Sequence, residues 1–225
     1  PPKTYVYREV ELSPEQKKVY KSISDVAVAV LDGKVLSVDT VLTQMLRLHQ
    51  VTCGHYTSDE GDVVKVPNNR ITELMQVLEE SSNKVIIWAT YIQDILAILS
   101  ALKDEYGDES TVAYYGAVNQ DDRNIAIDRF QKDPTCRFFV GNPQTGSMGI
   151  TLTAADTVVY YSNNYNLEHR LQSEDRAHRI GQDKNVLYVD LICKGTIDSK
   201  IVKALRDKKN IAQQVMGDDW KQWLT

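Results

Sequence analysis

The sequence lacks the features that mark several familiar classes of protein. Its three cysteines, Cys53, Cys136 and Cys193, are odd in number and far apart, which argues against a disulfide framework and favours a reducing, intracellular compartment. No apolar run approaches the length of a membrane span, and no secretion signal is recognisable. With 26 basic and 31 acidic side chains, the net charge of -5 argues against a general polyanion binder.

The sequence also lacks the motifs of a complete nucleotide or metal site. It contains no phosphate loop of the form G-x-x-x-x-G-K-[ST]. The acidic pair Asp104-Glu105 lies at a predicted helix end and does not follow an apolar strand, so it is a poor Mg²⁺ motif. The run Cys53-Gly54-His55 is spaced too tightly for zinc, and no second Cys/His pair follows it. We therefore predict no metal site in this chain.

The distribution of apolar residues divides the chain into three predicted parts. Residues 1–66 form an extended segment and a helical extension, which is a protrusion or linker. Residues 67–193 form an α/β lobe, and residues 194–225 form closing helices. The chain opens on Pro-Pro-Lys without Met, which favours a piece of a longer polypeptide.

The helical extension has clear start and stop signals. Ser-Pro-Glu-Gln at residues 13–16 combines an N-cap serine with proline at the first helical position, and predicts a helix that runs to about Leu31. A second helix is predicted over about 38–51 from an apolar stripe with helical spacing. The polar stretch 54–69 is expected to be a linker or an exposed loop.

Within the α/β lobe, short apolar runs rich in β-branched and aromatic residues alternate with helical patterns. The predicted strands cover residues 84–89, 111–115, 136–141, 157–161 and 186–192. The predicted helices cover residues 70–80, 91–106, 120–131, 146–152 and 167–180. Continuous apolar strands that alternate with helices indicate a parallel sheet covered by helices on both faces.

Small polar residues follow the predicted strands. Thr90 follows the first strand, Gly116 the second, and N-P-Q-T-G-S (142–147) the third. Ligands of open α/β sheets bind outside the carboxyl ends of the strands, so these residues are candidates for contacts with phosphate. For any single loop, an ordinary turn with a helix cap is the simpler interpretation.

The stretch Q-S-E-D-R-A-H-R-I-G-Q (172–182) combines a glutamine and two arginines at helical spacing. On a helix, Gln172, Arg176 and Arg179 fall on one face, within about a third of the circumference. On this stretch alone, a solvated helix face is the simpler interpretation. In that case residues four apart would form surface pairs, Glu174 with His178 or Asp175 with Arg179.

Several segments together support a family assignment. The most specific are G-I-T-L-T-A-A-D-T-V-V (149–159) and the arginine stretch that follows it; V-L-T-Q-M-L-R-L-H-Q (41–50), R-N-I-A-I-D-R-F-Q (123–131) and K-G-T-I-D-S-K-I (194–201) agree with them. Through most of its length the chain resembles the second RecA-like lobe of a Swi/Snf-type DNA translocase, within helicase superfamily two. The wording of L-R-L-H-Q-V-T-C-G-H looks nearer to bacterial or phage members than to large chromatin remodellers.

The resemblance implies one half of an ATP site. An upstream RecA-like lobe of the same polypeptide would hold ATP and Mg²⁺, and Arg176 and Arg179 would reach the γ-phosphate as arginine fingers. Gln172 would help to position that face. Gly149 and Asp156 belong to the segment that links the nucleotide side to the DNA side, although ordinary structural roles stay open for both.

The resemblance also assigns the ends of the strands to double-stranded DNA. The backbone-phosphate contacts fall on Thr90, Gly116, Arg123, Thr145, Gly146 and Ser147, with Tyr165 against a sugar or base. Tyr165 stands where tryptophan is usual in the family, and Gln144 stands where a basic residue is common. Such contacts would be independent of DNA sequence and would weaken with salt.

The sequence therefore predicts the C-terminal lobe of an ATP-dependent double-stranded DNA translocase, which alone is monomeric and essentially inactive. A eukaryotic source would place it in the nucleus, and a bacterial or phage source in the cytoplasm. The alternative is a non-catalytic docking module for nucleic acid or protein. The last long helix carries a basic run, which consists of Lys200, Lys203, Arg206, Lys208 and Lys209. This run either contacts DNA or covers an apolar stripe with the aliphatic parts of its side chains.

Overall fold

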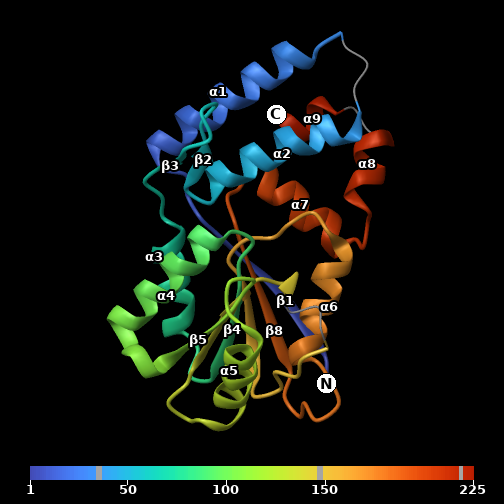
Figure 1. Cartoon of the computed structure of the whole chain (residues 1–225). Coiled ribbons are helices and arrows are strands. Elements are labelled where there is room, and N and C mark those ends of the chain that lie inside the picture. The colour runs from blue at the N-terminus through green and yellow to red at the C-terminus, as the bar shows by residue number, and fades with distance from the viewer. Residues whose placement is uncertain (34–36, 146–148, 218–219) are drawn as a thin grey trace. The chain divides into compact units, whose positions relative to one another are not determined.

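A computed structural model describes residues 1–33, 37–145, 149–217 and 220–225 of the chain (Figure 1). These residues form two compact units, each built from segments that are separated in the sequence. The first unit comprises Pro1–Arg8, Ile71–Asn164 and Glu168–Leu191, and the second comprises Glu9–Arg70, Tyr165–Leu167 and Ile192–Thr225. No helix among the described residues is both long and apolar enough to cross a membrane. The three-part division expected from the sequence stays a prediction.

The first unit contains a six-stranded parallel sheet in the order β1-β8-β7-β4-β6-β5. Its strands are β1 (Lys3–Glu9), β4 (Lys84–Trp88), β5 (Thr111–Tyr114), β6 (Phe138–Gly141), β7 (Ala155–Tyr160) and β8 (Val186–Ile192). The central strands β4, β6 and β7 are almost fully buried, which explains their continuous apolar sequences. The predicted α/β fold with a parallel sheet is confirmed.

Helices cover both faces of this sheet. They are α3 (Arg70–Glu79), α4 (Ile92–Tyr106), α5 (Gln120–Lys132) and α6 (Leu167–Ala177), with the short 3-10 helix η1 (Asp108–Ser110) before β5. Phe139 lies in one core cluster with Phe130 of α5 and Ala177 of α6. The adjacent Phe138 packs instead against Tyr106 of α4, with the ring centroids 4.9 Å apart. Neighbouring strand residues point to opposite faces, so α4 covers the face opposite to α5 and α6.

The first strand of the sheet was not predicted from the sequence. Residues Lys3–Glu9 form β1 at the edge of the sheet, beside β8. The Val186 amide donates to the Pro2 carbonyl at 3.3 Å, and the Val10 amide donates to the Ile192 carbonyl at 2.8 Å, so the two strands run parallel. The strand is mostly exposed. Its polar residues therefore hide the strand pattern in the sequence.

The second unit is mainly helical. Its helices are α1 (Pro14–Leu31), α2 (Val38–Thr52), α7 (Ile197–Arg206), α8 (Ile211–Gly217) and α9 (Lys221–Leu224). The predicted start of α1 is confirmed, because Ser13 and Gln16 form a reciprocal capping box. A continuous apolar cluster joins α1, α2, α7, α8 and α9, with Leu48 and Ile197 at its buried centre.

A buried ion pair lies beside this apolar cluster in the second unit. The Arg70 guanidinium binds Asp198 and also donates to the Thr52 carbonyl at 3.1 Å. The other Asp198 oxygen accepts the Thr52 hydroxyl at 2.6 Å, and the Cys193 amide donates to Asp198 at 3.0 Å. These contacts join the end of α2, the start of α3 and the start of α7.

Three details of the predicted secondary structure are wrong. The stretch 54–69 is not only a loop, because β2 (His55–Thr57) pairs with β3 (Val63–Lys65) in an antiparallel hairpin. Residues 149–152 do not belong to a helix, and the rest of the helix predicted over 146–152 lies outside the described residues. Helix α6 ends at Ala177, so it does not extend to residue 180.

Candidate functional site

Helix α6, which leads to the two candidate arginines, is fixed in the first unit by the buried side chain of Arg170. The Arg170 guanidinium binds both oxygens of Asp190, at 2.6 and 3.2 Å. It also donates to Asn163 at 2.7 Å and to Glu174 at 2.8 Å, and it stacks 3.7 Å over the Tyr160 ring. Sequence analysis missed Arg170, although an aspartate inside the apolar strand β8 indicates a buried cationic partner.

The acidic residues of α6 do not form the surface pairs considered from the sequence. Glu174 is buried and accepts from Arg170 and from the Tyr5 hydroxyl at 2.7 Å. The His178 imidazole lies 2.6 Å from the Pro1 carbonyl, so the pairing of Glu174 with His178 is wrong. Asp175 accepts from Lys3 at 3.0 Å.

The chain turns immediately after α6, and Gln182 holds this turn against the start of β7. Its side-chain amide donates to the carbonyls of Ala155 at 2.8 Å and Ala177 at 3.1 Å. Arg179 therefore lies in the turn, beyond Ala177 at the end of α6. The expectation that Gln172, Arg176 and Arg179 share one face of a single helix is wrong, although all three line one hollow.

The Arg179 guanidinium contacts the segment that precedes β7. It donates to the carbonyl of Gly149 at 2.7 Å, to that of Ile150 at 3.3 Å and to the Thr151 hydroxyl at 3.2 Å. Gly149 has φ +71, a conformation that a side chain disfavours, and its carbonyl is the nearest of these acceptors. Thus two residues that sequence analysis assigned to the nucleotide side, Arg179 and Gly149, are in direct contact.

Arg176 lies on the last turn of α6 and is largely buried. Burial lowers the pKa of its guanidinium, and the nearby positive charge of Arg179 lowers this pKa further. Gln172, Arg176 and Arg179 line an open hollow of about 680 Å³. Two neighbouring guanidinium groups at an open hollow form a site whose electrostatics favour an anion.

Gln172 and Asp156 occupy different places in the first unit. The Gln172 amide donates to Glu168 at 2.9 Å, at the rim of the hollow. Asp156 lies at the start of β7, where it accepts from Asn83 at 2.6 Å and pairs with Lys184 at 3.4 Å. The structure thus brings Gln172, but not Asp156, into the hollow with the arginines.

A second group of predicted residues gathers at the carboxyl ends of the strands. The Thr90 amide, just after β4, donates to the Ser162 hydroxyl at 2.8 Å. The Asn142 amide group donates to the Thr90 carbonyl at 2.9 Å, and the Asn142 backbone N–H donates to the Tyr114 carbonyl at 3.0 Å. Within the described part of the chain, the buried Thr90 hydroxyl has no hydrogen-bond partner. Sequence analysis named Thr90 but missed the tie made by Asn142.

The remaining residues assigned to DNA are only partly brought together. The Arg123 guanidinium donates to the Gly116 carbonyl at 2.9 Å and stacks 5.7 Å over the Tyr114 ring. Thr145 follows β6 and is half-buried, whereas Gly146 and Ser147 lie outside the described residues. Tyr165 is 38% exposed and belongs to the second compact unit.

No group of three or more His, Cys, Asp or Glu residues that could hold a metal ion occurs in residues 1–33, 37–145, 149–217 and 220–225. The three cysteines are buried and free.

Comparison with protein families gives one match. A family model described as "Helicase conserved C-terminal domain" matches residues 68–181, which is half of the chain. The matched region contains the sheet strands β4 to β7, the strand-end residues, and both Arg176 and Arg179.

Curated relatives are chromatin-remodelling factors. "Chromatin-remodeling ATPase INO80" of Mycosarcoma maydis is 35% identical over 66% of this chain, which covers 8% of that protein. "CHD3-type chromatin-remodeling factor PICKLE" of Arabidopsis thaliana is 29% identical over 96% of this chain, which covers 17% of that protein. The chain thus spans less than a fifth of the length of these relatives. The expected bacterial or phage origin stays a prediction.

Solved structures show the same fold. The C-terminal part of the Fun30 ATPase domain has a TM-score of 0.75 at 19% identity, covering 90% of this chain and 89% of that one. The Sulfolobus solfataricus SWI2/SNF2 ATPase C-terminal domain has a TM-score of 0.69 at 21% identity, covering 95% and 89%. The Sulfolobus solfataricus SWI2/SNF2 ATPase core in complex with double-stranded DNA has a TM-score of 0.73 at 24% identity, covering 98% of this chain and 47% of that one.

Proposed function

This chain belongs to the helicase conserved C-terminal domain family, and we propose that it is the second lobe of an ATP-dependent translocase on double-stranded DNA. Its fold is that of SWI2/SNF2 ATPase C-terminal domains. The observation that carries the proposal is the pair Arg176 and Arg179, which line one open hollow. An internal structural role would not require two guanidinium groups at the rim of a hollow.

The hollow fits the phosphates of a nucleotide. Burial and the charge of Arg179 both disfavour the protonated form of Arg176, and an anion between the two side chains would relieve both effects. Arginine suits this role because its planar fork meets phosphate oxygens in pairs and stays charged. The two side chains would stabilise the negative charge that develops on the γ-phosphate during hydrolysis.

Arg179 has to change partners to take this role. In the structure it donates to the Gly149 and Ile150 carbonyls, which offer only partial negative charge. A phosphate oxygen carries more charge and forms stronger hydrogen bonds with a guanidinium. Release of Arg179 would free residues 149–151, and this segment follows directly on the loop after β6. The contact therefore supports a link between the nucleotide side and the DNA side.

We assign the DNA contacts to the ends of the strands. Thr90, Gly116, Arg123 and Thr145 all follow strands of one sheet, and the buried Thr90 hydroxyl lacks a partner within the described residues. Hydroxyl, backbone and guanidinium groups bind phosphate oxygens without reading the base sequence. The name of one structural relative includes a complex with double-stranded DNA. Gly146, Ser147 and Tyr165 stay part of this proposal on sequence grounds.

Hydrolysis in this proposal needs a second lobe. ATP supplies the phosphoryl group, and Mg²⁺ would be held by the upstream RecA-like lobe with the phosphate loop, because the present sequence has no such motif. The residues here would orient and stabilise the phosphates from the opposite side. Gly149 and Asp156 would support this side indirectly. The isolated chain is therefore expected to be monomeric and essentially without ATPase activity, and a eukaryotic source would imply a nuclear location.

The decisive experiment measures ATP hydrolysis in a protein that joins this chain to its upstream lobe, with and without duplex DNA. Arg179→Ala should lower the DNA-stimulated rate by about 10³-fold or more, as for other arginine fingers, while DNA binding is largely kept. Arg47→Ala is the matched control, because Arg47 is an exposed arginine on α2.

Three outcomes would contradict parts of the proposal. If Arg179→Ala kept the rate of Arg47→Ala, the finger would be misassigned. If the joined protein bound duplex DNA but hydrolysed no ATP, the chain would be a docking module. Appreciable DNA-stimulated hydrolysis by the isolated chain would contradict the half-site.

A further inference from the structure

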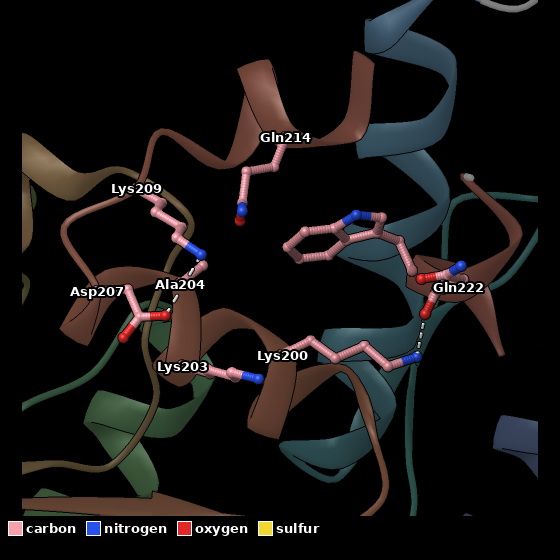
Figure 2. A pocket seen from close by; sticks show the side chains of 8 residues that line it. Lys200, Lys203, Ala204, Asp207, Lys209, Gln214 and Gln222 are labelled. Carbon is pink, nitrogen blue, oxygen red and sulfur yellow. Dashed lines mark hydrogen bonds and ion pairs between the residues drawn. The ribbon is translucent and has the colours of Figure 1, made fainter. Parts of the chain in front are cut away.

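A cavity in the second unit is lined by the basic run of α7 and the segments that follow it. The cavity measures about 260 Å³ and is lined by Lys200, Lys203, Asp207, Lys209, Gln214 and Trp223, among others. Figure 2 shows Gln214 and Lys203 directed toward this space from α8 and α7, with Lys209 at one side. None of these residues lines the arginine hollow of the first unit.

The backbone after α7 has an unusual conformation at Lys208, and the next residue, Lys209, lines the cavity. Lys208 has φ +54, and among the described residues it is the only one other than glycine with positive φ. The Lys208 amide donates to the Leu205 carbonyl at 3.0 Å, and the Lys209 amide donates to the Ala204 carbonyl at 2.8 Å. A helix end of this kind usually has glycine at the left-handed position. Strain of this kind is often stored at functional sites.

The charge around the cavity is predominantly positive. Three lysines line it, against one carboxylate, and that carboxylate, Asp207, lies 3.5 Å from Lys209. The Lys200 ammonium donates to the Gln222 carbonyl, a neutral partner. Burial lowers the pKa of Lys200, since the charged form is poorly solvated there. An anion in the cavity would compensate this positive charge.

We infer that this cavity binds a phosphate-bearing anion. Lys203 and Lys209 supply the charge, and the Gln214 amide, directed toward the same space, adds a hydrogen-bond donor. Trp223 is 6% exposed and forms a rigid wall of the cavity. The basic run therefore does more than cover the apolar stripe of α7, because its side chains and those of α8 and α9 enclose one space.

The phosphate comes either from a small polyphosphate or from a DNA backbone, and two probes separate these sources. Calorimetric titration of the 225-residue chain with tripolyphosphate should show binding. The double variant Lys203→Gln/Lys209→Gln should bind at least about tenfold more weakly, because each lost ammonium removes a charge-assisted hydrogen bond. Both lysines are exposed, so the variant should keep the thermal unfolding temperature of the wild type.

Lys208→Asn is the matched control, because it removes one exposed charge from the same segment and keeps a residue that tolerates the left-handed conformation. Its affinity should stay within about threefold of the wild type. A short DNA duplex is the second probe. If the duplex binds the wild type, binds the double variant more weakly and is not displaced by tripolyphosphate, the cavity binds the phosphates of a DNA backbone. Equal affinity of wild type and double variant for both probes would overturn the inference, as would the absence of binding to either probe.

Discussion

The two compact units each bury an arginine–aspartate pair, but the two pairs have different surroundings. In the first unit, Arg170 binds both oxygens of Asp190 and also contacts the Asn163 amide, the carboxylate of Glu174 and the ring of Tyr160. In the second unit, Asp198 is the shared acceptor, which binds Arg70, the Thr52 hydroxyl and the Cys193 amide. In the first pair the arginine thus makes most of the contacts, whereas in the second pair the aspartate does.

This difference follows from what each pair has to hold. Arg170 belongs to α6, and its contacts with β7 and β8 fix the helix that leads to Arg176 and Arg179. Asp198 lies in the first turn of α7 and binds the end of α2 and the start of α3. The first pair therefore orients α6 against the six-stranded sheet, whereas the second joins helix ends beside the apolar cluster of the second unit.

Loss of the cation in the first pair should have the largest effect on stability. Arg170→Ala would leave Asp190 fully buried and without its bidentate partner. Breaking a buried pair in this way costs about 3–5 kcal/mol, measured as the free energy of unfolding in a denaturant titration. Arg129→Ala is the control, since Arg129 is a partly exposed arginine with acidic partners, and its loss should cost less than about 1 kcal/mol. Similar costs for both variants would contradict the structural role of Arg170.

Replacement of the Asp198 carboxylate in the second pair by an amide should have a smaller effect on stability. The asparagine side chain of Asp198→Asn keeps one oxygen that can accept hydrogen bonds. Asp198→Asn should cost about 1.5–3 kcal/mol at neutral pH, the usual value of hydrogen bonds to charged groups. Burial alone would raise the pKa of Asp198, but the charges of Arg70 and His49 and the hydrogen bonds from Thr52 and Cys193 outweigh it and lower this pKa below its ordinary value of 3.8.

The lowered pKa of Asp198 predicts a pH dependence. A carboxyl group whose pKa is lower in the folded state stabilises the fold above its unfolded pKa, and this stabilisation is lost as the pH falls through the folded value. The free energy of unfolding of the wild type should therefore fall as the pH is lowered from neutral to below 3.8. In Asp198→Asn this fall should be smaller. Asp207→Asn serves as the control. An identical acid profile in all three proteins would show that Asp198 does not titrate in this way.

Loss of the exposed side chain of Arg179 should have the smallest effect on stability, in contrast to loss of the buried side chain of Arg170. The Arg179 side chain lies at the surface and donates hydrogen bonds to the segment 149–151. Arg179→Ala should change the free energy of unfolding by less than about 0.5 kcal/mol, as for surface substitutions in general. A loss comparable to that of Arg170→Ala would indicate that Arg179 supports the fold.

The sequence predicted the buried elements of the fold well, because their patterns are strong. The strand predicted over 186–192 has the bounds of β8, and the helix predicted from Pro14 to about Leu31 has the bounds of α1. The edge strand β1 was missed because most of its residues are exposed and polar residues interrupt it. The hairpin of β2 and β3 was missed because its strands have only three residues each.

The sequence predicted which residues belong to the candidate site better than it predicted the backbone structure that carries them. The stretch 149–152 is not helical, since Gly149 has positive φ and β-branched residues follow it. Helix α6 ends before Arg179 because Gln182 holds the following turn. Arg170 and Glu174 are four residues apart and therefore resemble a surface pair in the sequence. Only the sheet behind them shows that both are buried.

The position of β1 has a consequence for the order in which the protein can fold. This strand is synthesised before the other five strands of its sheet, but its partner β8 is the last of the six in chain order. This edge of the sheet can close only after β8 has been synthesised, and until then the apolar side chains of Tyr5, Val6 and Tyr7 form an aggregation-prone segment. Pairing over so long a loop is slow, so nascent chains should depend on chaperones during this interval.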